Sequence, residues 1–199
     1  MVKFPFWPCL NMGAFRFDSN AYGERVAAIL ALDGAGERLM PLAHGTCSNK
    51  EAARLLHEAK PRALFPRARH PEAAMSGLWM YFSCLDQAHK LAQDTASAEG
   101  SFWHGIMHRQ EPDPGNAAYW FRRVGRHRIF PALQEEAAGI RQRYAGLPMA
   151  GGEEWDPFAF IDYCESARRK PKSDAERLAM EIQRVEWQLL FDWCAKEGA

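Results

Sequence analysis

The residues most able to do chemistry lie between Glu99 and His127, in EGSFWHGIMHRQEPDPGNAAYWFRRVGRH. This stretch holds three of the seven histidines, together with carboxylates and arginines. On an α-helix His104, His108 and Glu111 fall within an arc of about 60°, because they stand at positions i, i+4 and i+7. Two imidazoles one turn apart can chelate a metal ion, and a carboxylate one turn further on can complete a facial set. The spacing is therefore compatible with a divalent metal such as zinc or iron.

Other polar side chains could reach the same place. His89 shares the apolar stripe of the preceding predicted helix, so we expect it to point inward toward the cluster. Arg109 or Arg123 could hold an anionic group of a substrate. The candidate metal ligands are His104, His108, Glu111 and His89. The full candidate ligand-binding set is His89, His104, His108, Arg109, Glu111, Asn116, Tyr119 and Arg123.

Three interpretations of this cluster remain open. It can be a metal site, which in an enzyme would support a hydrolytic or oxidative step. It can be a metal-free pocket for a small anionic ligand. Alternatively, the protein is a non-catalytic interaction or scaffold protein in which Glu111 and Asp113 neutralise buried arginines. The histidine pair alone does not decide, because it lacks the glutamate that HExxH zinc proteases place inside the pair. Whether the protein is an enzyme stays open.

Residues 85–133 resemble an uncharacterised family of small bacterial and fungal helical proteins. The shared pattern is a histidine in a long helix followed by W-H-x-I-x-H-R-x-E-x-D-x-x-N-x-x-Y-W-x-x-R-x-G. In this chain it falls on His89, Trp103, His104, Ile106, His108, Arg109, Glu111, Asp113, Asn116, Tyr119, Trp120, Arg123 and Gly125. The later segments WDPFAFIDYCE and IQRVEWQLLFDWC are similar too. The resemblance implies a helical fold with a shared site and assigns no reaction.

Helix signals recur along the chain, whereas hairpin turns between alternating runs do not occur. Caps, apolar stripes and prolines predict helices over about 19–34, 48–60, 71–94, 98–110, 114–124, 130–146, 156–169 and 173–198. Ser48 and Ser173 each begin a capping box, and Asp113 can cap the helix after the double proline. The sequence therefore predicts an all-α single domain spanning 1–199, a bundle of about seven or eight helices.

The last of these segments carries two apolar stripes. Leu178, Ile182, Val185, Leu189 and Trp193 form one, and Met180, Trp187, Phe191 and Cys194 form the other. A helix that is apolar on two sides is either central in its own fold or shared with a partner. Burial within the monomer and a homodimer through this helix both fit the pattern.

Composition limits the classes of partner. Lys plus Arg and Asp plus Glu each total 25 among 199 residues, so no net charge attracts the chain to nucleic acid. No apolar run is long enough to cross a membrane. The segment MVKFPFWPCLNMG is broken by prolines and makes a poor signal peptide. The five cysteines form no CxxC pattern, so we expect five free thiols in a cytoplasmic protein.

Overall fold

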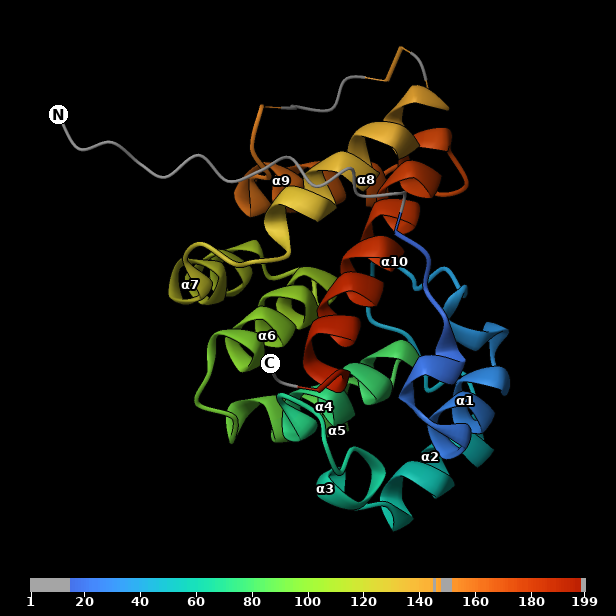
Figure 1. The fold of residues 1–199 in the computed structure, drawn as a ribbon. Helices are drawn as coiled ribbons and strands as arrows, with labels where there is room; N and C mark the ends of the chain where they lie inside the picture. The colour runs from blue at the N-terminus through green and yellow to red at the C-terminus, as the bar shows by residue number, and fades with distance from the viewer. Residues whose placement is uncertain (1–14, 145, 148–151, 198–199) are drawn as a thin grey trace, which may run out of the picture.

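The computed structural model describes residues 15–144, 146–147 and 152–197, and within these ranges the chain folds as an all-α bundle without a β-strand (Figure 1). Two short 3-10 helices, η1 and η2, accompany the α-helices in the N-terminal third. The elements are η1 (Ser19–Tyr22), α1 (Glu24–Ala31), η2 (Gly34–Gly36), α2 (Lys50–Glu58), α3 (Pro61–Leu64), α4 (Pro71–Tyr81), α5 (Leu85–Gln93), α6 (Ala98–Gln110), α7 (Pro114–Val124), α8 (Phe130–Gln142), α9 (Pro157–Arg168) and α10 (Asp174–Ala195). The predicted fold class is confirmed.

The long helix predicted over 71–94 is wrong, because the structure breaks it into α4 and α5. Ser83 adopts φ 58°, which ends the helical path after Phe82. Contacts from distant parts of the chain hold the break: Arg38 donates to Ser83 Oγ at 2.9 Å, and the Ser48 amide donates to the Phe82 carbonyl at 2.8 Å. This split and the additional short α3 account for ten α-helices where about seven or eight were predicted.

Local capping explains where the site-bearing helices begin. Ser97 caps α6, accepting a hydrogen bond from the Gly100 amide at 3.1 Å. Asp113 caps α7 as predicted, through the Asn116 amide at 3.1 Å. Ser173 likewise caps α10. At α2 the cap is Asn49 and not the predicted Ser48. These side chains satisfy amide groups that a helix N-terminus leaves without partners.

Helix α10 runs lengthwise through the middle of the bundle (Figure 1). It packs against α4 toward one end and against α8 and α9 toward the other. Both of its apolar stripes are covered inside this single chain: Ile182 and Leu189 of one stripe are buried, as are Trp187 and Phe191 of the other. The pattern that suggested a homodimer is thus accounted for by burial within the monomer.

The expectation of five free thiols is wrong. Cys47 and Cys84 form a disulfide, because the connector before α2 lies against the break between α4 and α5. Cys164 and Cys194 are free and buried. Cys9 and the segment judged a poor signal peptide lie outside the described residues. The inference of a reducing, cytoplasmic compartment loses the support that it drew from free thiols.

Within the described part of the chain, no helix is long and apolar enough to cross a membrane. One hydrophobic core extends from Tyr22 to Cys194 and joins all parts of the bundle. Helices α5, α6 and α7 form one side of it, with α6 packed between the other two. That side carries most of the predicted site residues.

Candidate functional site

The structure brings three predicted site histidines together. The ring centroid of His89, on α5, lies 4.8 Å from that of His104 and 5.7 Å from that of His108, both on α6. The His104 and His108 rings are stacked at 6.1 Å, as their spacing of one helical turn requires. We call these three side chains the histidine cluster.

His104 is the buried member of the cluster, with a relative exposure of 1%. Its ring stacks on the indole of Trp120 from α7, with centroids 4.0 Å apart. Its Nδ1 lies 3.2 Å from the Gly100 carbonyl oxygen, whereas its buried Nε2 has no hydrogen-bond partner among the described residues. Burial, with smaller contributions from His89 and His108, lowers the pKa of His104 to about 4. The imidazole is therefore neutral at pH 7.

His108 lies at the rim of the cluster beside Glu111. Its Nδ1 is 3.0 Å from Glu111 Oε2, and its side chain is 13% exposed. The carboxylate of Glu111 thus faces an imidazole, where the scaffold interpretation had paired it with an arginine. The contact is not aligned as a hydrogen bond, so the carboxylate acts on the ring through its charge alone.

Glycines of α6 let neighbouring groups approach closely. A Cβ on Gly105 would lie 2.7 Å from the Phe121 ring of α7, and one on Gly100 would lie 2.2 Å from the Thr95 carbonyl oxygen. Small residues on a helix can make room either for a ligand or for another helix. The structure shows that protein atoms fill the space beside both.

Arg109 does not join the cluster. Because it follows His108 by one residue, it points about 100° further around the helix, toward α10. There its guanidinium forms a buried ion pair with Glu186 and lies 4.5 Å from the centroid of the Phe160 ring. Arg109 therefore belongs to the framework that joins α6 to α9 and α10.

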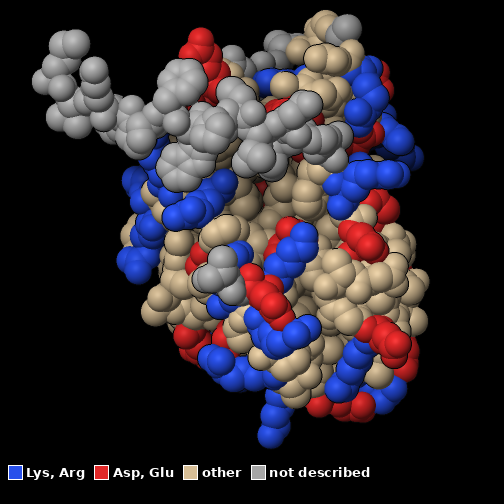
Figure 2. Space-filling model, viewed as in Figure 1, with Lys and Arg blue, Asp and Glu red and all other residues tan. Residues whose placement is uncertain are grey.

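The predicted residues of α7 are exposed and serve different roles. Asn116 donates through Nδ2 to Asp113 Oδ2 at 2.7 Å, within the helix cap. Arg123 lies 5.9 Å from the Tyr119 ring and 5.4 Å from the Trp120 ring. Lys and Arg side chains gather over α7 on the face that Figure 2 shows. Among Asn116, Tyr119 and Arg123, it is Arg123 that lies nearest the histidine cluster, because it contacts Trp120 and Trp120 stacks on His104.

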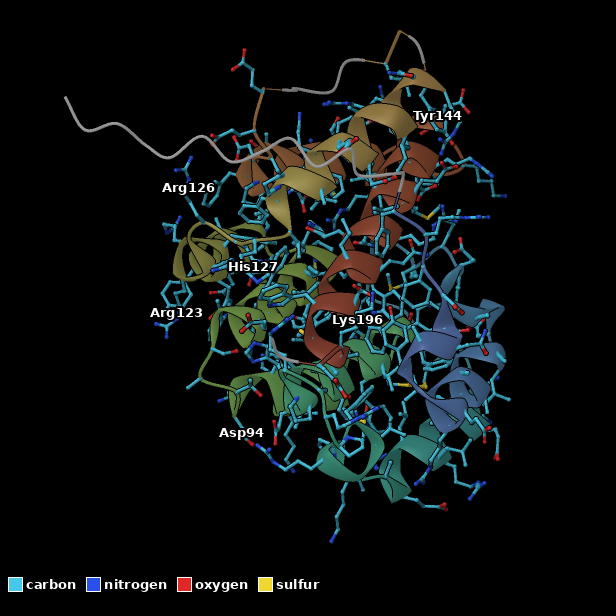
Figure 3. The ribbon with its side chains drawn as sticks, viewed as in Figure 1. Asp94, Arg123, Arg126, His127, Tyr144 and Lys196 are labelled. Carbon is cyan, nitrogen blue, oxygen red and sulfur yellow. A yellow bond between two sulfur atoms is a disulfide. The ribbon has the colours of Figure 1, made fainter. Side chains whose placement is uncertain are left out.

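A second polar cluster was not found from the sequence. Glu99, on the first turn of α6, is buried and accepts a hydrogen bond from Trp193 Nε1 at 2.9 Å. His70 Nε2 lies 3.3 Å and His127 Nε2 3.6 Å from Glu99 Oε1. His127 is buried and points into the molecule (Figure 3). The partners come from three distant segments, so no local spacing could reveal them.

Within the described ranges, no group of three or more His, Cys, Asp and Glu side chains could hold a metal ion as arranged. The three rings of the histidine cluster are therefore neighbours, but as they stand they are not arranged to coordinate one metal ion. A metal bound there would need rotation of at least one imidazole.

Comparisons with known proteins find no relative of this chain. No protein-family profile matches the chain, and neither the curated proteins nor the solved structures contain a match. The resemblance of residues 85–133 to a helical family stays a prediction, and function must be argued from the geometry of the site.

Proposed function

We propose that the protein binds a divalent transition-metal ion, such as zinc or iron, at the histidine cluster. The observation that carries the proposal is His104: a buried, neutral imidazole whose Nε2 has no hydrogen-bond partner in the described part of the chain. A buried polar atom without a partner is costly unless a ligand satisfies it.

The groups that lie beside Nδ1 of His104 and His108 support this assignment. A carbonyl oxygen only accepts, so the contact with Gly100 requires His104 to carry its proton on Nδ1. In His108 the Glu111 carboxylate lies 3.0 Å from Nδ1 without hydrogen-bond alignment, and its negative charge favours the same tautomer electrostatically. In both rings the lone pair is then on Nε2, the arrangement that proteins use in metal-binding histidines.

The arrangement favours chelation by His104 and His108, one turn apart on α6, with His89 turning toward them as a third ligand. Two or three imidazoles leave coordination positions open for water or a substrate. Zinc and iron both accept imidazole nitrogen. If the protein is an enzyme, a hydrolytic or oxidative step assisted by the metal is the expected chemistry.

A structural role is the second candidate, and the packing of His104 favours it. The ring stacks on Trp120 with an interplanar angle of 15°, which suits a side chain that joins α6 to α7. On this alternative the protein is a scaffold or interaction protein and the histidines serve as its framework.

A metal titration of protein prepared without a histidine tag distinguishes a metal site from a purely structural role. We expect the wild-type chain to bind one zinc ion, measured by calorimetry, and His108→Ala to weaken binding by at least about tenfold through loss of one ligand. His44→Ala is the matched control, because it removes an exposed histidine that is distant in the chain from the histidine cluster, and it should leave binding unchanged. Circular dichroism verifies that each variant is folded. Absence of zinc binding in the wild type, or equal binding in His108→Ala, would establish the structural role instead.

A further inference from the structure

A groove of about 950 Å³ lies between the bend that joins α7 to α8 and the start of α9. It does not include any member of the histidine cluster. Four aromatic side chains line it: Phe121, Phe130, Trp155 and Phe158. Its size falls within the range of small-molecule sites, roughly 300–1,000 Å³, and such sites are mostly apolar with a few polar groups.

The charges at the rim of the groove largely neutralise one another. Arg126 and Glu154 form an ion pair at 3.0 Å. Asp156 accepts hydrogen bonds from the Phe158 and Ala159 amides as the cap of α9. Arg122 and Glu153 are also opposite in sign, so the lining holds two arginines and three carboxylates in all. This small negative excess disfavours an anion, and the aromatic lining suits an uncharged occupant.

Trp155 supplies a polar group for such an occupant. The residue is 7% exposed, and its Nε1 has no hydrogen-bond partner among the residues that the structure describes. An indole N–H only donates, so the complementary group is an acceptor. Buried tryptophan N–H groups usually find a partner.

We propose that this groove binds an uncharged, flat aromatic molecule that carries a hydrogen-bond acceptor such as a ring carbonyl. The ring system packs against Phe130 and the partly exposed Phe158. Trp155 Nε1 is buried in the unbound protein, so the indole turns slightly to donate its hydrogen bond to the acceptor. Binding here is independent of the histidine cluster, because the two places share no lining residue.

Nile red, an uncharged fused-ring dye with a ring carbonyl, is a suitable probe for the full chain. We expect saturable one-to-one binding with blue-shifted emission. Phe158→Ala and Trp155→Phe are each expected to raise the dissociation constant about three- to tenfold, since one removes an aromatic contact and the other a donor.

Leu32→Ala is the matched control, because Leu32 and Phe158 have the same exposed fraction of 39% and Leu32 lies on the other side of the bundle, after α1. It should bind the dye like the wild type. Phe158→Ala removes a partly exposed side chain, so it should fold normally, as circular dichroism can verify. Dissociation constants that are equal in the wild type, Phe158→Ala and Trp155→Phe would overturn the proposal, and so would a dye signal that never saturates.

Discussion

The ion pair between Arg109 and Glu186 is withdrawn from water, with side-chain exposures of 1% and 0%. Gln183 also accepts from Arg109, at 3.4 Å. Removing one charge of such a pair leaves the other buried without a partner, at a typical cost of about 3–5 kcal/mol. We therefore expect Arg109→Met to lower the free energy of unfolding by that amount in urea denaturation.

The double variant Arg109→Met, Glu186→Leu is the control for this first prediction. It removes both charges and keeps similar volume, so most of the lost stability should return. If the single variant were as stable as the wild type, Glu186 would have another partner and α6 would not be joined to α10 through this pair.

Glu99 should make stability depend on acidic pH. Burial alone would raise the pKa of its carboxyl, but the neighbouring His127 imidazole and the hydrogen bond from Trp193 outweigh burial and hold that pKa well below its ordinary value. A carboxyl whose pKa is lowered by folding stabilises the native state above its unfolded pKa of about 4.3, and this contribution is lost as pH falls below that value.

We accordingly expect the difference in unfolding free energy between the wild type and Glu99→Gln to shrink as pH falls from about 5 to about 3. Urea denaturation at several pH values measures it. Glu135→Gln, at an exposed position of α8, should show a small difference that hardly varies. A difference for Glu99→Gln that stayed constant over this range would mean that the carboxyl titrates normally.

At the scale of helices, substituting alanine for two glycines in helix interiors should change the stability of the protein in opposite directions. A Cβ on Gly77 of α4 would lie 2.7 Å from the buried Trp103 ring and 3.2 Å from Phe191, whereas nothing lies within 4 Å of one on Gly139 of α8. We expect Gly77→Ala to destabilise by about 1–3 kcal/mol through overpacking. Gly139→Ala should stabilise by about 0.5–1 kcal/mol through helix propensity. Thermal or urea unfolding compares them directly, and a stabilising Gly77→Ala would show that α4 and α6 are less tightly packed.

Helices whose ends are determined locally could be predicted from the sequence. The bounds of α6 and the Asp113 cap of α7 agree with the structure because Ser97, Asp113 and the prolines act on their own backbone neighbours. The break at Ser83 could not be predicted, since Arg38 and Ser48 hold it from a distance and no glycine or proline marks it.

The same distinction applies to the candidate site. Helical spacing placed His104 and His108 together, and the inward stripe of α5 brought in His89. Helical spacing turns Arg109 away from the two histidines, but its role depends on Glu186, which lies 77 residues further along the chain, so the sequence could not distinguish a binding arginine from a structural one. Long-range partners decide the role of a polar residue, and local pattern does not reveal them.

At the scale of the whole molecule, the position of α10 predicts the oligomeric state. Its two apolar stripes pack against α4, α8 and α9 of the same chain, so little apolar surface on this helix remains for a second copy. Stable homodimers bury apolar surface that a monomer would expose, and α10 offers little of that kind, since only Met180 and Trp193 of its stripes are partly exposed. We expect light scattering after size exclusion to give a mass near 22.6 kDa in neutral buffer. A mass twice as large would require either an interface elsewhere on the bundle or an arrangement in which α10 leaves its place at the centre. Hydrogen exchange would distinguish these outcomes, because the amides of α10 should stay the most protected only if the helix remains buried.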